Sequence, residues 1–299
     1  MARGTGRELN GLSTVQWYAA PAKLNLLLHV LGRRADGYHE LQTVFRLIDR
    51  ADRVGIAPRD DGVLQRLDVL PGVAPQDDLC LRAALRMKDL ARARIGSAAE
   101  RLGAQIALDK RLPIGAGLGG GSSDAATVML ALNRLWDLNL GRTALIAEAA
   151  QLGADVPFFV FGRDALGEGI GERLSALALP PAWYLVLIPP VSVSTREVFA
   201  AATLTRDSKP LKIPPFFQGL GRNDLEPVVT ARYPEVAAHL DWLRQHCPGA
   251  RMTGSGACVY AEFDSAVDAR ALRSLLPASM QGFLVAGLSR HPLHDWPEE

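Results

Sequence analysis

Cysteine is scarce in this sequence, and the three that occur form no pattern. Cys80, Cys247 and Cys258 are far apart, and none belongs to a C-x-x-C pair. A disulfide-stapled secreted domain needs several cysteines that can pair, and a structural zinc site needs closely spaced ligands. The sequence supports neither class, and the few scattered thiols favour a reducing compartment.

A long hydrophobic run and an excess of one charge are missing as well. No apolar stretch approaches the roughly 18 residues of a membrane span, and residues 1–14 lack the hydrophobic region of a signal peptide. The 33 basic and 32 acidic residues leave a net charge of +1, whereas proteins that bind nucleic-acid phosphates show a basic excess. We therefore expect a cytoplasmic protein with neither a membrane nor a nucleic acid as partner. Residues 1–16 are expected to form a flexible extension.

The sequence does contain a dense glycine segment. Five of the seven residues from Gly115 to Gly121 are glycine, and Ser122 and Ser123 follow at the start of a helix expected over residues 122–136. Glycine tolerates positive φ and carries no Cβ, so such a loop can place successive backbone N–H groups around an anion. The positive end of the helix dipole points at the same place. This segment predicts a phosphate-binding loop rather than a structural turn without a ligand.

Better-known phosphate loops fit this segment less well. Gly115-x-Gly117-x-x-Gly120 satisfies the dinucleotide-binding pattern, but that motif requires an acidic residue at the end of a second strand. The nearest candidate, Asp137, falls at the end of the expected helix itself. The lysine that closes a Walker A loop and the catalytic segment of a protein kinase are both missing. A dinucleotide-dependent oxidoreductase is therefore the weaker alternative.

The rest of the chain alternates strands and helices irregularly, which favours an α+β fold of two lobes around a shared cleft. We expect the boundary within residues 162–181, with a phosphate-binding and catalytic domain over 17–175 and a second domain over 176–299. Residues 207–221 are expected to form a loop that covers the cleft. The expected strands are 18–31, 41–47, 52–56, 105–108, 183–188, 282–288 and part of 251–263. The expected helices are 79–93, 143–152, 233–245 and 267–276. A further helix is expected to start near Thr195, with Ser194 as its N-cap.

Three separated segments form a set: PAKLNL near the start, LPIGAGLGGGSSDAA in the middle and MTGSGACVYAEF near the end. The set resembles the three motifs of the small-molecule kinase superfamily named for galactose, homoserine, mevalonate and phosphomevalonate kinases, the GHMP kinases. The segments PAKLNLLLHVLGRRADGYHELQTVF, GADVPFF and GLGRNDLEP narrow the resemblance to the branch that phosphorylates a diphosphocytidyl methylerythritol. The resemblance extends from about Trp17 to His294. Several motifs in order are a more specific signal than one glycine loop.

The resemblance implies a two-lobed GHMP-kinase fold with the active site between the lobes, and a C-terminal domain of GHMP type. It implies transfer of the γ-phosphoryl group of ATP to the 2-hydroxyl of the methylerythritol, in non-mevalonate isoprenoid biosynthesis. ATP and Mg²⁺ are the implied cofactors, with the hydroxyl of Ser122 or Ser123 as a candidate Mg²⁺ ligand. Asp124 is already explained as an acid in the first turn of a helix. The residues implied to bind ATP are Lys110, Pro113, Gly115, Gly117, Gly119, Gly120, Gly121, Ser122 and Ser123.

Lys23 and Asp155 match the catalytic pair of the family. Asp155 is expected to accept the proton of the attacking hydroxyl. Lys23 is expected to keep that carboxylate ionised and to stabilise charge on the transferred group. Without the resemblance, Asp155 reads as a turn residue and Lys23 as an exposed strand lysine. A lysine inside an apolar run, however, needs an anionic partner if its strand is buried.

Tyr38 and His39 match the residues that bind the cytosine of the substrate. The base offers a flat face for stacking and an edge that hydrogen bonds can read, and these two side chains suit those tasks. Phe45 and Phe199 match further aromatic positions around the base. From residue type alone, both phenylalanines are candidates for the core.

Two further elements are expected beside the substrate. Asn25 lies two residues after Lys23, so that in a strand both side chains share a face, and Asn25 is expected to orient the substrate. Gly254 and Ser255 belong to the third motif, a glycine turn expected to pack beside the phosphate loop, where larger side chains would obstruct close approach.

One position departs from the family pattern. Where the family commonly has an asparagine near the adenine, this sequence has Asp78, which keeps an acceptor but loses the amide donor. Adenine contacts are therefore expected to rest more on the backbone and on Lys110. Mevalonate or homoserine kinase activity, or a non-catalytic nucleotide-binding role, stay as alternatives. The segment with Tyr38 and His39 favours an acceptor that carries a base, and no oligomeric state is predicted.

Overall fold

The computed structural model describes residues 15–68, 73–211 and 221–297. The extension expected over residues 1–16 lies almost wholly outside the described residues, as do residues 212–220 of the loop expected over 207–221. In the part of the chain that is described, no helix combines the length and the apolar character needed to cross a bilayer.

The strands are β1 (Gln16–Arg33), β2 (His39–Arg59), β3 (Leu64–Arg66), β4 (Gly103–Asp109), β5 (Ala165–Gly169), β6 (Arg173–Ala176), β7 (Trp183–Ile188), β8 (Arg251–Met252), β9 (Val259–Phe263) and β10 (Gln281–Leu288). The α-helices are α1 (Leu79–Ile95), α2 (Gly120–Leu135), α3 (Arg142–Ala149), α4 (Val156–Phe161), α5 (Thr195–Ala200), α7 (Glu226–Arg232), α8 (Pro234–His246) and α9 (Ala266–Ser274). Short 3₁₀ helices occupy Pro75–Asp77 and Gly96–Arg101.

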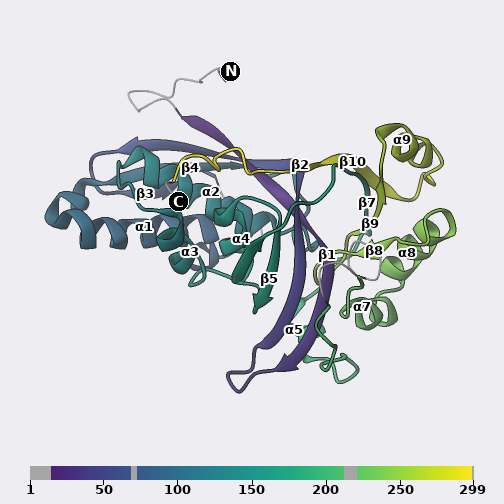
Figure 1. The fold of residues 1–299 in the computed structure, drawn as a ribbon. Helices are drawn as coiled ribbons and strands as arrows, with labels where there is room; N and C mark the ends of the chain where they lie inside the picture. Colours follow the sequence, from purple (N-terminus) through teal and green to yellow (C-terminus); the bar gives the residue numbers. More distant parts are fainter. Residues whose placement is uncertain (1–14, 69–72, 212–220, 298–299) are drawn as a thin grey trace.

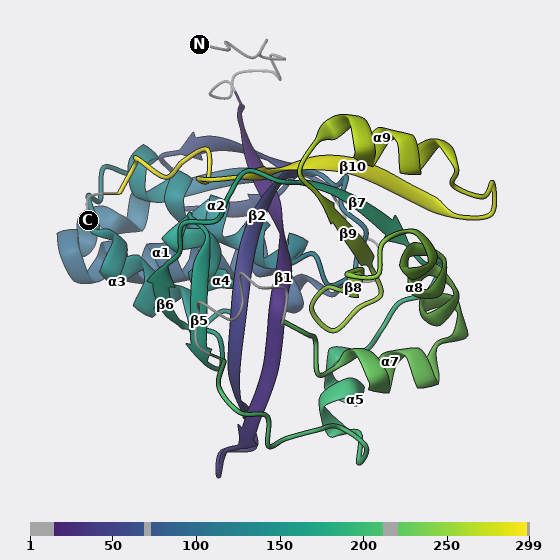
Figure 2. The same ribbon diagram turned by 45° about the vertical axis from the view of Figure 1, so that its right-hand side comes forward.

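Strand β2 is the spine of one sheet that joins both halves of the molecule. The sheet has the order β3-β4-β2-β10-β7-β9-β8, with β1 and β5 also bonded to β2. One edge of β2 pairs with β1 along nearly its whole length, and β5, β10 and β4 pair with it at residues 41–45, 47–48 and 53–59. Figure 1 shows β1 and β2 crossing the middle of the molecule. Figure 2 shows β10 reaching from one half to the other.

The helices form a layer on each half. Helices α1 to α4 gather beside β4 and β5, and α7 to α9 gather beside β7 and β9 (Figure 1). Helix α1 begins where Asp78 accepts hydrogen bonds from the amides of Cys80 and Leu81, and it ends at Gly96, which has a φ of +60°. Helix α5 begins at the predicted Ser194 cap, whose hydroxyl accepts from the amide of Glu197. Such caps satisfy amides that have no partner inside the helix.

Among the described residues, three clusters of buried side chains make up the core. In the first half, alanines of α1 and α2 are fully buried and let these helices approach closely. A second cluster lies under α7 and α8. The third joins the two halves, because it combines Leu24 of β1, Val44 of β2, Leu118 of the glycine loop and Tyr184 of β7. The glycine loop is thus anchored in the core through Leu118.

The α+β class is confirmed, and one local expectation needs correction. The strands expected at 41–47 and 52–56 are one strand, β2, in which the exposed Asp49 and Arg50 form a bulge opposite the Pro21–Ala22 step of β1. In the sequence, the polar residues of this bulge resemble a turn between two strands. In the structure, β1 and β2 remain paired on both sides of the bulge. The apolar run at 157–161 forms the short helix α4.

The end of the described chain returns to the first half. After β10, Leu293 and the partly buried Trp296 pack into the cluster of α1 and α2, and the amide of His291 donates to the carbonyl of Gly162 (2.8 Å). The division of the chain at residue 175 stays a prediction.

A buried ion pair holds β2 and the start of β5 together. Arg46 Nη1 lies 3.0 Å from Asp164 Oδ2, and both side chains are buried. Asp164 Oδ1 also accepts from the amide of Leu47 (3.0 Å). A Cβ at Gly287 of β10 would collide with the Arg46 guanidinium, so the pair depends on glycine in the strand that joins the halves. Burial raises the pKa of Asp164 to about 6, against the attraction of Arg46.

Loss of Asp164 should therefore destabilise the fold strongly. We expect Asp164→Ala to lower the free energy of unfolding by about 3–5 kcal/mol, because it leaves the Arg46 charge buried without a partner. Urea unfolding followed by circular dichroism measures the change. The matched control is Asp60→Ala, which removes an exposed pair with Arg101 and should change stability little. Equal losses in the two variants would contradict this account.

Candidate active site

Two adjoining cavities lie between the halves. The larger, called here the loop cavity, has a volume of about 450 Å³ and is lined by the glycine segment, Lys23 and Asp155. The smaller, called the aromatic cavity, has a volume of about 400 Å³ and is lined by Tyr38, His39 and Phe199. The two cavities adjoin, because five residues line both. The residues common to both linings are Leu41, Ala154, Ile170, Thr195 and Phe199.

The glycine segment packs against the second glycine turn with backbone touching backbone. Gly117 and Gly254 have φ angles of +77° and +56°. A Cβ at Gly117 would collide with the carbonyl of Thr253, and one at Gly254 would lie 2.9 Å from the carbonyl of Gly117. Only glycine permits this approach at these two positions. The expectation that the two motifs lie side by side is confirmed.

The start of α2 presents free amides to the loop cavity. The Ser123 amide closes a helical hydrogen bond to Gly119 O (2.9 Å), so the amides of Gly120, Gly121 and Ser122 precede the helical ladder. These three residues line the cavity. Free amides at the positive end of a 16-residue helix suit a phosphate group.

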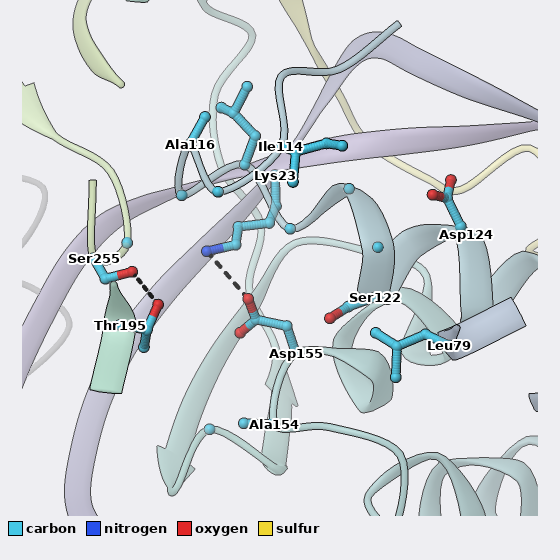
Figure 3. A pocket seen from close by; sticks show the side chains of 18 of the residues that line it. Lys23, Leu79, Ile114, Ala116, Ser122, Asp124, Ala154, Asp155, Thr195 and Ser255 are labelled. Carbon is cyan, nitrogen blue, oxygen red and sulfur yellow. Dashed lines mark hydrogen bonds and ion pairs between the residues drawn. The ribbon is translucent and has the colours of Figure 1, made fainter. Parts of the chain in front are cut away.

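The structure separates the two serines that the sequence treats alike. Ser122 lines the loop cavity, and Figure 3 shows its hydroxyl on the side of Asp155. Ser123 is fully buried, and its hydroxyl donates to the carbonyl of Pro21 (2.7 Å). The expected role of Ser123 in binding ATP or Mg²⁺ therefore lacks geometric support, because its side chain faces β1 rather than the cavity.

Lys23 and Asp155 meet at the wall of the loop cavity. Lys23 Nζ lies 3.3 Å from Asp155 Oδ2, with the lysine side chain 3% exposed and the aspartate side chain 33% exposed. Figure 3 shows the two side chains directed at each other. Asp155 occupies the N-cap position of α4 but makes no capping hydrogen bond. Its carboxylate is therefore available to the lysine and to the cavity.

Asn25 holds the same lysine through its side-chain oxygen. Its Oδ1 accepts from Lys23 Nζ (2.5 Å), and its Nδ2 donates to Thr43 Oγ1 (2.8 Å). The amide of Asn25 in turn donates to Thr253 Oγ1 (2.9 Å). Lys23 and Asn25 share one face of β1, as expected from their spacing. Thr43 fixes the side-chain amide of Asn25, and Thr253 binds its backbone N–H.

Lys110 lies behind the loop between two carboxylates. Its Nζ donates to Asp52 Oδ2 (2.5 Å) and to Asp124 Oδ2 (2.8 Å). Asp52 is fully buried and also accepts from the amides of Arg111 and Leu112 (2.6 and 2.7 Å). This triad ties β2, the start of the glycine loop and α2 together. Lys110 lines the cavity, but any contact with ATP is made by a lysine already engaged with two carboxylates.

Asp78 lies at the far end of the loop cavity, where the adenine was expected. Its Oδ1 caps α1, and its Oδ2 accepts from Arg66 Nη1 (2.9 Å). The carboxylate is thus committed to a buried ion pair and a helix cap. The lining of the same cavity also includes the apolar residues Val73, Leu79 and Ile114.

The aromatic residues divide between the two cavities. His39 and Phe199 lie together, with ring centroids 5.1 Å apart, and Tyr38 is 59% exposed beside them. Phe45 is elsewhere: it is buried, stacks on Phe158 at 4.5 Å and lies beneath Lys23. The structure therefore brings three of the four expected aromatics to one place, and Phe45 to the Lys23–Asp155 pair instead.

The second glycine turn reaches α5 at the cavity rim. Ser255 Oγ and Thr195 Oγ1 are 2.6 Å apart, and both line the loop cavity (Figure 3). Asn223, from the segment GLGRNDLEP, holds this turn by donating to the carbonyls of Met252 and Gly254 (2.9 and 2.8 Å).

A metal ion at this site would be held mainly by a bound phosphate compound rather than by side chains. In the described part of the chain, no group of three His, Cys, Asp or Glu side chains lies close enough to hold one. The Ser122 hydroxyl in the loop cavity fits an ion that phosphate oxygens already carry.

Comparison with known proteins identifies related chains. The family models "GHMP kinases N terminal domain" and "GHMP kinases C terminal" match residues 78–163 and 213–281. A protein of Nitrosospira multiformis named 4-diphosphocytidyl-2-C-methyl-D-erythritol kinase is 58% identical over 94% of each chain. A protein of Thiobacillus denitrificans with the same name is 57% identical over 95% of this chain and 99% of its own.

Solved structures share the fold. The crystal structure of a 4-(cytidine 5'-diphospho)-2C-methyl-D-erythritol kinase matches with a TM-score of 0.77 and 35% identity, over 92% of this chain and 100% of that one. A crystal structure of mevalonate kinase matches with a TM-score of 0.66, over 92% of this chain and 100% of that one. At 15% identity this match shows the fold alone.

The triad behind the loop should make stability depend on pH. Burial raises the pKa of Asp124 to about 7, against the attraction of Lys110. Between the ordinary carboxyl pKa of about 4 and this value the folded protein holds a proton that the unfolded chain has released, so stability falls as pH rises. Relative to Asp124→Asn, the wild type should lose stability from pH 5 to 7, by at most about 1.4 kcal/mol per pH unit. Urea unfolding at several pH values measures this.

The control is Asp109→Asn, at an exposed aspartate paired with Arg111 beside the triad. This variant should keep the pH slope of the wild type. If Asp124→Asn also keeps that slope, Asp124 is ionised over the whole range and the account is wrong.

Proposed function

This chain belongs to the 4-diphosphocytidyl-2-C-methyl-D-erythritol kinase family of the GHMP kinases, and we propose that it phosphorylates the 2-hydroxyl of 4-diphosphocytidyl-2-C-methyl-D-erythritol. The reaction consumes ATP and yields ADP and the 2-phosphate, in the non-mevalonate route to isoprenoid precursors. That the chain is an ATP-dependent small-molecule kinase follows from its family.

The observation that carries the proposal is the Lys23–Asp155 pair at 3.3 Å on the wall of the loop cavity. As the acceptor oxygen bonds to the γ-phosphorus, the bond from that phosphorus to the β,γ-bridging oxygen breaks and ADP leaves. Asp155 takes the proton of the hydroxyl. Lys23 holds the carboxylate in place and offsets the negative charge on the transferred group. Phosphoryl transfer needs little covalent help, so positioning supplies most of the catalysis.

The loop cavity fits the triphosphate. The free amides of Gly120, Gly121 and Ser122 are the proposed donors to phosphate oxygens. Mg²⁺ bound to the triphosphate would neutralise its charge, with the Ser122 hydroxyl as the proposed protein ligand. The apolar wall of Val73, Leu79 and Ile114 is the proposed adenine subsite.

The aromatic cavity fits the cytidine of the acceptor. Tyr38 and Phe199 offer ring faces for stacking, and His39 offers a nitrogen for the edge of the base. The wall shared by the two cavities lets the diphosphate link extend from the base toward Asp155. Mevalonate and homoserine carry no base, so these substrates would leave the aromatic cavity unused.

Release of ADP with Mg²⁺-ATP and a panel of acceptors tests the proposal. We expect turnover with the cytidylated methylerythritol and none with methylerythritol phosphate, mevalonate or homoserine. Asp155→Asn should lower kcat by about 10²- to 10⁴-fold, the usual contribution of a general base, while ATP still binds. The control Asp241→Asn, on the exposed side of α8, should keep full activity. Turnover confined to another acceptor, or near-normal activity of Asp155→Asn, would refute the corresponding part.

Tyr38 should serve the acceptor and not ATP. We expect Tyr38→Ala to raise the KM for the cytidylated acceptor about tenfold, in line with the loss of one aromatic stacking contact, and to leave the KM for ATP unchanged. Tyr38→Phe keeps the ring and should behave like the wild type. If Tyr38→Ala raises both KM values equally, the cytidine subsite is misplaced. Steady-state kinetics with each substrate varied separately distinguishes the outcomes.

A further inference from the structure

His39 receives a hydrogen bond from an arginine that neither the motifs nor the proposed mechanism includes. Arg206 Nε lies 3.1 Å from His39 Nε2, although 167 residues separate the two along the chain. An arginine nitrogen can only donate. His39 Nε2 must therefore present its lone pair to Arg206, and the proton of the neutral ring must be on Nδ1.

The guanidinium is itself fixed by the backbone at the end of α5. Arg206 Nη2 donates to the carbonyls of Phe199 (3.0 Å) and Ala201 (2.7 Å), and Nη1 donates to that of Leu204 (3.2 Å). Four of its five N–H donors are thus used. One side chain orients His39 and also ties down the backbone of Phe199, whose ring lies 5.1 Å from the imidazole.

The charges around the imidazole keep it neutral. Burial lowers the pKa of His39, and the nearby Arg206 and Arg33 lower it further. Arg33 of β1 lies directly opposite His39 of β2 in the register of the two strands. Both charged side chains that act on the ring are therefore cations, and a protonated Nε2 would place an N–H against the N–H of Arg206.

We propose that Arg206 is a positioning residue that sets the tautomer of His39, so that the aromatic cavity offers an Nδ1–H donor to the edge of the bound base. This inference rests on the proposed function for the identity of the base. Cytosine carries an acceptor at ring position 3, whereas uracil carries an N–H there. A fixed donor therefore selects for cytosine, while a ring free to exchange tautomers would accept either base.

The first test needs neither substrate nor activity. Long-range ¹H–¹⁵N NMR of the full-length, ligand-free protein reports which nitrogen of each histidine carries the proton. The sequence has six histidines, and loss of one signal set in His39→Gln assigns His39. We expect the proton on Nδ1 at pH 7 in the wild type and a mixture of both tautomers in Arg206→Met. A proton on Nε2 in the wild type, or an unchanged tautomer in Arg206→Met, overturns the proposal.

The second test uses kinetics. At pH 8, Arg206→Met should raise the KM for the cytidylated acceptor about tenfold, the typical effect of one lost hydrogen bond, and leave the KM for ATP unchanged. As pH falls toward 6 this KM should recover, because an imidazolium again carries a proton on Nδ1. The wild type should show no such recovery. Arg206→Met should also lose preference for the cytidine acceptor over its uridine analogue.

Arg232→Met is the matched control, because Arg232 also holds α5, through Glu197 (3.0 Å), but does not contact His39. It should match the wild type in tautomer, KM and base preference. An acceptor KM in Arg206→Met that is raised but independent of pH shows a purely structural role and overturns the tautomer assignment. Failure of the wild type to use any cytidylated acceptor refutes the proposed function, while the NMR result still decides the role of Arg206.

Discussion

The register between β1 and β2 is the constraint on which both cavities depend. Lys23 and Asn25 come from β1, and His39, Thr43 and Asp52 come from β2, so one ladder of backbone hydrogen bonds positions groups in each cavity. Side chains alternate between the faces of a strand, so a slip of one residue would turn every one of them to the opposite face. The bulges between Pro21 and Ala22 and between Asn25 and Leu27 are part of this register. Each bulge determines toward which face of the sheet the side chains after it point.

The second requirement is close approach of backbones. The glycine segment and the Gly254 turn are far apart in the sequence and touch where neither has a side chain. Lys23 lies against the same contact: its Nζ would be 3.2 Å from a Cβ at Gly254, and its Cε 3.1 Å from one at Gly119. The glycines therefore leave room for Lys23 as well as for a ligand. Asn223 secures the arrangement by binding two carbonyls of the turn.

Local signals allowed much of this to be predicted from the sequence. The strand at 183–188, the start of the helix at Leu79 and the Ser194 cap follow from short-range patterns and are confirmed. The motifs indicated Lys23 and Asp155, whose pairing the structure shows. Contacts between distant residues left no such signal. The carboxylates on Lys110, the arginine on His39 and the position of Phe45 under Lys23 depend on which strands meet. Ser122 and Ser123 are adjacent and identical, and only the rotation of α2 separates their roles.

The strand that joins the halves also has a consequence for synthesis on the ribosome. Residues 281–288 pair with β2 at residues 47–48 and with β7, so the sheet closes only after most of the chain has been translated. Until then β7 lacks its partner along residues 183–188 and β2 lacks one at residues 47–48, and such unpaired backbone edges are templates for association with other chains. Contacts of such long sequence separation also slow folding. A nascent chain with a completed first half is therefore the species most exposed to aggregation, and the one that chaperones would most need to protect.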